Sequence, residues 1–189
     1  MARWYEAQSA PERVILRPTQ NYTVDSSLPT HTIYMPKKVP EDVKLPILVW
    51  GEGGCAANGL AFNGMLTNWA SYGFLILASG PPRGNGSTTS KYMSDAITWI
   101  SSKAGSGLYA AADPTRISAA GMSCGGLEAY DMNANDKVSY IGIFNSGLLQ
   151  NTSSIANIKK PVFFFLGGPS DIAYVNVSAF FSQGMGSTG

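Results

Sequence analysis

The chain carries one short motif with the residue types of a catalytic nucleophile. Residues 116–130 read RISAAGMSCGGLEAY, and within them GMSCG is a G-x-S-x-G sequence centred on Ser123. A serine held on a sharp turn between a strand and a helix can attack a carbonyl carbon, and that turn requires small residues two positions to either side. Gly121 and Gly125 meet this requirement. We therefore predict a nucleophile at Ser123; the alternative is a glycine-rich turn that merely contains a serine.

Strands and helices alternate along the sequence and must position this serine. Apolar runs typical of strands buried on both faces occur at 46–51, 74–79, 140–147 and 161–168, with an early strand at 31–36. Helical spacing predicts helices over 59–73 and 91–105, the second with Met93, Ile97 and Ile100 on one face, and another helix from about Gly126. Residues 81–90 are expected to form a surface loop. The pattern predicts the α/β class, with a mostly parallel sheet sandwiched between helices on both faces.

Length and composition limit the possibilities further. The 189 residues predict one domain over 1–181 and a flexible tail over 182–189, SQGMGSTG. With 44% apolar and 13% charged residues and a net charge of +1, the chain gives no reason to expect nucleic acid as a partner. No apolar run approaches the ~20 residues of a membrane span. A flavodoxin-like nucleotide binder is disfavoured, because no phosphate-binding glycine motif follows the first strand.

Four motifs together resemble a known family. They are WGEGGC at 50–55, SCGGLEAY at 123–130, IFNSGLL at 143–149 and GGPSDIAY at 167–174, and the segment ADPTRISAAGMSCGG at 112–126 leads into the serine. The chain resembles the α/β-hydrolase fold, specifically its esterase- and dienelactone-hydrolase-like members of fungal secreted type. The resemblance extends to about residue 176 and implies a three-layer fold and a serine hydrolase of carboxylic esters that needs no cofactor.

The resemblance also implies an oxyanion hole. One N–H group would come from Cys124, and the other from Glu52 or Gly53 in the loop after the strand at 46–51. The two loops would converge, so Cys55 and Cys124 are expected to form a disulfide; two free buried cysteines are the alternative. With only two cysteines and one distant histidine, zinc is not expected.

The acid of the implied triad is Asp171, and Glu128 is a weaker candidate, expected at the surface or behind the site. A helix N-cap is the other interpretation of Asp171. No histidine follows Asp171, and His31, the one histidine of the chain, is not favoured as a base and is expected at the surface. Family members continue into a further part that contains a histidine, so this chain is expected to be C-terminally truncated. Without that histidine its turnover is expected to be low. The sheet edge exposed by the truncation is expected to favour self-association.

Two functions therefore stay open. The first is a serine esterase, possible in this chain only if Ser123 is activated. The second is a non-catalytic protein on the same fold that binds a small-molecule or sugar-linked ligand, with Trp50, Met122 and Tyr174 lining the site. Sequons at Asn21, Asn85, Asn151 and Asn176, together with the cysteine pair, favour a secreted glycoprotein; a cytoplasmic location is the alternative.

Overall fold

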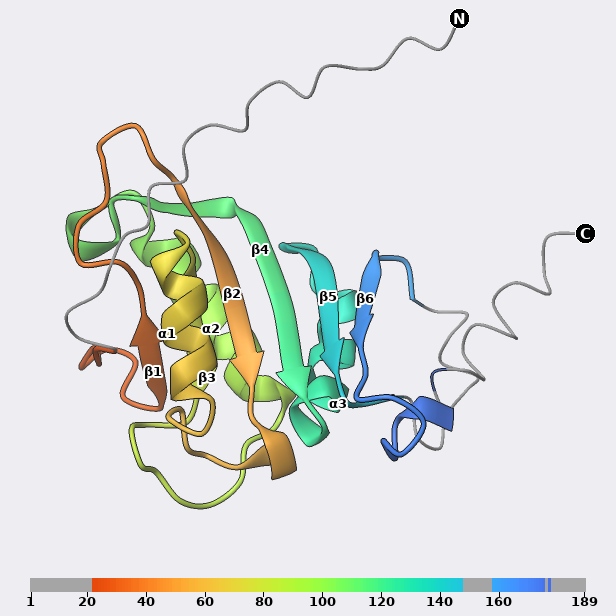
Figure 1. The fold of residues 1–189 in the computed structure, drawn as a ribbon. Coiled ribbons are helices and arrows are strands. Elements are labelled where there is room, and N and C mark those ends of the chain that lie inside the picture. The colour runs from red at the N-terminus through yellow and green to blue at the C-terminus, as the bar shows by residue number, and fades with distance from the viewer. Residues whose placement is uncertain (1–21, 148–157, 176, 178–189) are drawn as a thin grey trace, which may run out of the picture.

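The computed structural model describes residues 22–147, 158–175 and 177, and these form an α/β fold around one mixed sheet (Figure 1). Six strands lie in the order β1-β3-β2-β4-β5-β6. They are β1 His31–Tyr34, β2 Leu45–Gly51, β3 Leu75–Ser79, β4 Ala112–Met122, β5 Val138–Phe144 and β6 Val162–Phe165. Only β1 runs antiparallel to its neighbour, and the other pairings are parallel. The carboxyl ends of the parallel strands therefore meet along one edge of the sheet.

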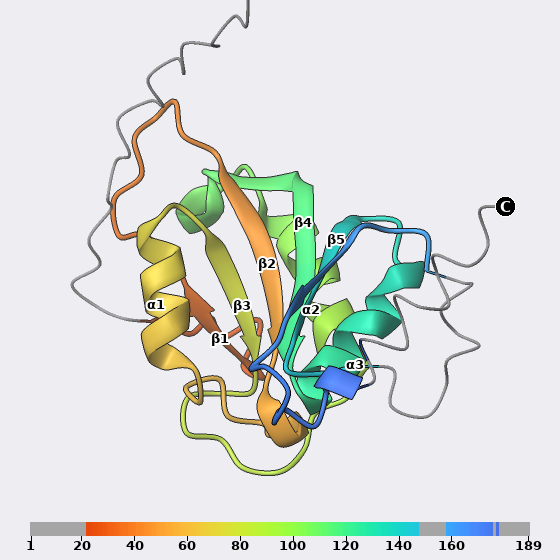
Figure 2. The same ribbon diagram turned by 45° about the vertical axis from the view of Figure 1, so that its right-hand side comes forward.

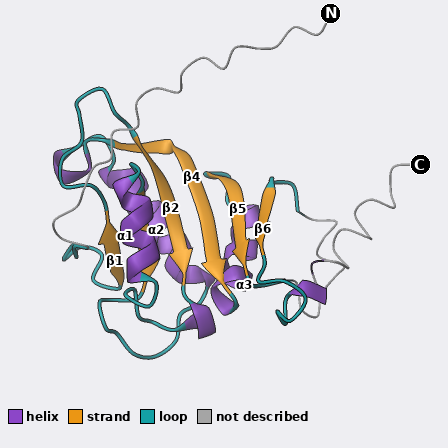
Figure 3. Cartoon of the chain, in the orientation of Figure 1, coloured by secondary structure: helices purple, strands orange, loops and turns teal. Residues whose placement is uncertain are grey.

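In the described part of the chain an α-helix follows each of β2, β3 and β4, and Figure 3 draws the helices in purple. They are α1 Asn63–Ser71, α2 Ser90–Lys103 and α3 Cys124–Asp131, and short 3-10 turns occur at Gly53–Cys55, Gly107–Tyr109 and Met132–Ala134. Figure 2 shows α1 beside β3, and α2 and α3 near β4 and β5. Each helix follows a parallel strand and returns the chain to the start of the next, which is the connection that parallel pairing requires.

Alternate residues of the central strand β2 belong to two hydrophobic clusters. Ile47 and Val49 join a larger cluster with Met93 and Ile97 of α2, whereas Leu48 and Trp50 join a smaller one with α1. Side chains of a strand point to opposite faces in turn, so a strand that is apolar at every position can pack on both sides. The buried run at 46–51 that was predicted from sequence has this role, since five of its residues have almost no exposed surface.

The predicted elements are confirmed with shifted ends, but the strands expected at 140–147 and 161–168 are not buried on both faces. The first of these is β5, in which Tyr140 is 50% exposed. The helix expected over 59–73 is shorter, and the one expected from about Gly126 begins at Cys124. The strand expected at 161–168 is shorter and not buried on both faces: Phe163 and Phe165 are 55% and 50% exposed. Their side chains and that of Tyr140 line an apolar groove of about 610 Å³, to which Trp69 of α1 also contributes. The predicted tail at 182–189 lies outside the described residues.

Candidate active site

Ser123 occupies the sharp turn that joins β4 to α3. Its backbone has φ 52° and ψ −114°, and the residue is exposed to solvent. Non-glycine residues with positive φ are uncommon and strained, and such strain concentrates at functional sites. The turn is held at the carboxyl edge of the sheet because Ser123 N donates to Phe144 O of the neighbouring strand β5 at 2.9 Å. The strand, the turn and the helix predicted around the serine are therefore present.

Close packing around the turn explains its glycines. A Cβ on Gly125 would overlap the carbonyl group of Gly51 at the end of β2, and one on Gly121 would overlap the carbonyl of Gly125. A Cβ on Gly126 would come within 2.6 Å of Ser146 Cβ. Only residues without a side chain let α3 begin this near to two strands. The glycines thus fix how the helix sits beneath Ser123.

Among the backbone N–H groups near the turn that have no acceptor within the described residues, two belong to half-buried residues that were predicted as oxyanion donors. The two residues are Cys124, which begins α3, and Gly53, which begins the 3-10 turn after β2. The first residues of any helix leave such donors unpaired, and a developing negative charge can use them. Glu52, the other predicted donor, is fully buried, and its carbonyl oxygen accepts from Gly125 N at 3.1 Å. Gly53, which is half-buried, is therefore the better-placed partner of Cys124.

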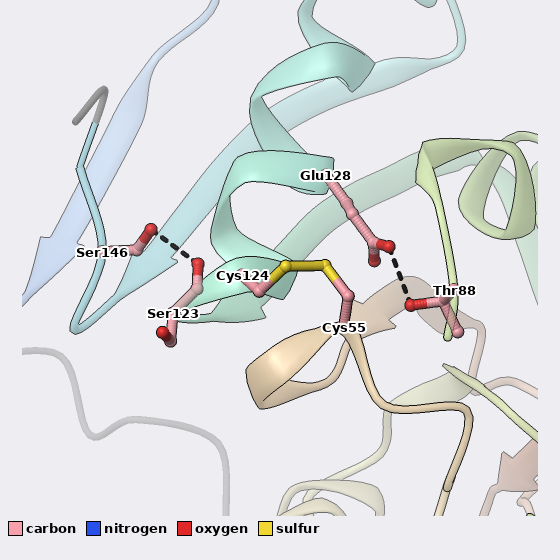
Figure 4. Close-up of a disulfide and its surroundings, with 6 residues drawn as sticks. All are labelled: Cys55, Thr88, Ser123, Cys124, Glu128 and Ser146. Carbon is pink, nitrogen blue, oxygen red and sulfur yellow. Dashed lines mark hydrogen bonds between the residues drawn. A yellow bond between two sulfur atoms is a disulfide. The ribbon is translucent and has the colours of Figure 1, made fainter. Parts of the chain in front are cut away.

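The predicted disulfide between Cys55 and Cys124 is present and clamps these two loops together (Figure 4). It joins residues 69 apart in sequence, with their Cα atoms 5.1 Å apart. Cys55 lies two residues after Gly53, one candidate oxyanion donor. Cys124 is the other candidate donor. The bond therefore fixes the spacing between the two N–H groups that would hold an oxyanion.

Two polar residues that follow β5 support the site and were missed from sequence. Ser146 is buried, and its hydroxyl donates to Ser123 O at 2.7 Å, as Figure 4 shows. Asn145 donates its side-chain amide to Asp171 Oδ2 and has φ 46°, a second strained residue beside Ser123. Polar residues directly after a parallel strand were the available signal, because such strands end at the same edge of the sheet.

Asp171 is placed beside this edge by a web of donors. Gly167 N and the Asn145 amide donate to Oδ2, and Ala173 N donates to Oδ1 at 3.0 Å. The hydrogen bonds from Ala173 N and Gly167 N, with a smaller part from Asn145, lower the pKa of the Asp171 carboxyl. The bond from Ala173 also matches the turn-capping role considered from sequence. Asn145 links the acid to β5, the strand next to the one that ends in Ser123.

His31 is not a base for this serine and is not on the surface, where sequence had placed it. It is fully buried in β1, and β3 and β2 separate it from β4, a span of roughly 14 Å at the usual strand spacing. Its Nε2 donates to Tyr92 O at 3.0 Å, so Nδ1 accepts from the Thr30 hydroxyl. Burial lowers the pKa of His31 to about 4. Both ring nitrogens are thus committed to the fold.

Two buried carboxyl groups lie behind the disulfide. Glu52 accepts from Trp50 Nε1 at 3.1 Å, and Glu128 accepts from the Thr88 hydroxyl at 2.7 Å. Burial, opposed by the Trp50 hydrogen bond and reinforced by nearby Glu128, raises the pKa of Glu52 to about 8. Burial also raises the pKa of Glu128, which is 4% exposed, so of the two positions considered from sequence the surface one is excluded. Figure 4 shows Glu128 across the disulfide from Ser123.

The three side chains expected to line the site differ in exposure. Trp50 is fully buried among Phe62, Trp69 and Phe144, so it packs in the core instead of facing a ligand. Met122 is half-buried, with Cγ beside Gly53, and Tyr174 is 38% exposed. An aromatic contact to a substrate therefore cannot come from Trp50.

Comparison with known proteins gives no assignment: the chain matches no model of a protein family and no curated protein. Within the described residues, no three His, Cys, Asp or Glu side chains are grouped closely enough to hold a metal ion. No helix in the described ranges is long and apolar enough to cross a membrane.

Proposed function

We propose that the protein is a serine hydrolase of carboxylic esters, with Ser123 as nucleophile, on a three-layer α/β-hydrolase-like fold with helices on both faces. The observation that carries this proposal is the strained, exposed turn at Ser123 between a parallel strand and a helix. That arrangement is the nucleophile elbow of such enzymes. It would be costly to keep at a turn without a function, since positive φ at a non-glycine residue is unfavourable.

The reaction follows from the groups at the turn. Ser123 Oγ attacks the ester carbonyl carbon, and the carbonyl oxygen becomes an oxyanion that accepts from the N–H groups of Gly53 and Cys124. The alcohol leaves, and water then hydrolyses the acyl-serine to release the acid. Asp171, ionised because its pKa is lowered, would orient a base and balance its positive charge. The protein uses no cofactor in this scheme, and the compartment that suits the disulfide is an oxidising one outside the cytoplasm.

The described residues offer no base for this scheme. No histidine occurs after Asp171 in this sequence, and His31 is buried in β1. Without a base, the hydroxyl of Ser123 is a weak nucleophile, and loss of a triad member lowers turnover by up to a million-fold. We therefore propose that the described site has the nucleophile, the oxyanion donors and the acid, and that a small imidazole in solution can act in place of the base.

Chemical rescue by imidazole tests this proposal. Hydrolysis of p-nitrophenyl acetate would be measured over a range of imidazole concentrations with the wild-type chain and with Ser123→Ala, because imidazole alone also cleaves this ester. The expected result is a rate difference between the two that grows with imidazole. Equal rates at every concentration would show that Ser123 is not a nucleophile. Thr89→Ala, an exposed hydroxyl residue away from the turn, is the matched control.

The second candidate is a non-catalytic protein that binds a small-molecule or sugar-linked ligand at the same site. The specific observation in its favour is the commitment of His31 to the fold, which leaves Ser123 without a base in the described residues. In that case a candidate ester or glycoside raises the melting temperature of the wild-type chain, while the imidazole experiment shows no dependence on Ser123.

A further inference from the structure

The loop between β3 and α2 holds one of the four sequons in a fully described setting. Asn85, Gly86 and Ser87 are all exposed, and neither the amide of Asn85 nor the hydroxyl of Ser87 hydrogen-bonds to another described residue. N-glycosylation needs both groups within reach of the transferase, and the middle residue must not be proline. Glycine stands in the middle here. The sequons at Asn21, Asn151 and Asn176 lie outside the described residues.

The backbone of this loop is anchored on both sides of Asn85, so the side chain is presented outward from a fixed turn. Gly84 N donates to Pro81 O at 3.0 Å, and Gly86 O accepts from Ala57 N at 3.0 Å. Gly86 has φ 93°, in the left-handed region that glycine adopts freely. A bulky group on Asn85 would therefore extend into solvent without the loop having to rearrange.

The disulfide adds an independent observation. Cys55 O accepts from Thr88 N at 2.7 Å, and Ala56 pairs with Ser87, so the sequon lies against the segment that begins at the bonded cysteine. Disulfides form and persist in the endoplasmic reticulum and outside the cell, which is also the route on which asparagine is glycosylated. A chain that acquires Cys55–Cys124 in such a cell therefore passes the enzyme that recognises Asn85.

We propose that Asn85 is an N-glycosylation site. In this step the Asn85 Nδ2 attacks C1 of an oligosaccharide carried on a polyprenyl pyrophosphate. An N–C1 bond forms, the C1–O bond to the pyrophosphate breaks, the amide loses one proton, and the lipid pyrophosphate leaves. The glycan is then fixed beside the loop that carries Gly53 and Cys55, at the rim of the candidate site. This assignment does not depend on whether Ser123 is a nucleophile.

The test is secretion of the full chain from a eukaryotic host behind a cleavable signal sequence, followed by digestion with a peptide N-glycosidase. That enzyme converts a glycosylated asparagine to aspartate, so the peptide with Asn85 should appear in its aspartate form after digestion and be missing from an undigested sample. The undigested sample is needed because an Asn-Gly pair such as Asn85-Gly86 can also deamidate without the enzyme. Asn85→Gln and Ser87→Ala should each remove one glycan from the intact mass. Ser87→Thr should keep the glycan, and Thr89→Ala, exposed and outside the sequon, should leave the glycan count unchanged.

Two results would overturn the assignment. One is an unmodified Asn85 peptide from secreted protein whose Cys55–Cys124 bond has formed, as shown by the absence of free thiols. The other is an Asn85→Gln protein whose intact mass still includes as many glycans as the wild-type protein. Because the peptide measurement uses the wild-type chain, a variant that fails to fold does not prevent a decision.

Discussion

Replacing Glu52 by glutamine should remove most of the pH dependence of stability above neutral pH. Glu52 is fully buried, and its pKa is raised from 4.5 to about 8. A group whose pKa is higher in the folded state binds its proton more tightly there. Its contribution to stability is therefore complete below pH 4.5 and is lost as the pH rises through 8. Glutamine keeps an oxygen that can accept from Trp50 Nε1, and it cannot ionise.

The size of the effect follows from the two pKa values. Each unit of difference is worth about 1.4 kcal/mol, so ionisation of Glu52 should destabilise the protein by about 2 kcal/mol between pH 6.5 and about 8.5. His31 acts in the opposite sense, because its pKa is lowered from 6.5 to about 4, and its contribution is complete above pH 6.5. Above pH 6.5 the change of stability with pH therefore reports the buried carboxyl groups and not His31. For a chain of this length, 2 kcal/mol is about 4–8 °C in melting temperature.

The assay is urea unfolding, followed by circular dichroism at several pH values across this window. The wild type should lose stability with pH, whereas Glu52→Gln should be flatter and more stable at the alkaline end. A small slope is expected to persist in Glu52→Gln, because burial also raises the pKa of Glu128. Glu41→Gln, at an exposed position, should keep the wild-type slope. If Glu52→Gln and the wild type lose stability in parallel, Glu52 ionises at its ordinary pKa and the reasoning is refuted.

Three further predictions concern the turn and its supports. Gly125→Ala should destabilise the protein by about 3 kcal/mol in urea unfolding, because the new Cβ would overlap Gly51. Gly64→Ala has open space around it and should be neutral or slightly stabilising. Equal stabilities of the two variants would contradict the packing argument. Loss of the disulfide in Cys55→Ser/Cys124→Ser should lower the free energy of unfolding by roughly 4 kcal/mol for a ring of this size, and an unchanged denaturation midpoint would be the opposing result. Asn145→Gly permits the positive φ but removes a donor, so the pKa of Asp171 should rise in an NMR titration of its carboxyl carbon; no rise would mean that Asn145 does not hold the acid.

Much of the frame around Ser123 could be predicted because it depends on local patterns. The helix α2 was predicted from the spacing of Met93, Ile97 and Ile100, and all three are buried against the sheet. The strand, turn and helix at Ser123 were predicted from the local glycine spacing, although the contacts that require Gly125 and Gly126 come from Gly51 and Ser146 in distant segments. The pairing of Cys55 with Cys124 was predicted from the resemblance, which placed both in converging loops, and the structure confirms it.

What sequence did not predict depends on contacts between distant segments. Glu128 and His31 are polar residues that are buried with hydrogen bonds from distant parts of the chain: Thr88 donates to Glu128, and Tyr92 O accepts from His31. Phe163 and Phe165 form a run as apolar as any buried strand, yet one face of β6 is uncovered in the described structure. Periodicity shows that a strand can be buried and says nothing of whether a second layer covers it.

The bond between Cys55 and Cys124 also determines how the protein responds to a pulling force. It closes a covalent ring that contains α1, β3, α2 and β4, whereas β1, β2, β5 and β6 lie outside it and α3 leaves it at Cys124. The cysteines are 69 positions apart, and the segment between them would extend to about 230 Å if it were free. None of that length can be drawn out while the bond is intact. A chain pulled from its ends in an optical trap, or threaded into the pore of an unfolding motor, should therefore stop at this ring and advance only when a reductant opens it.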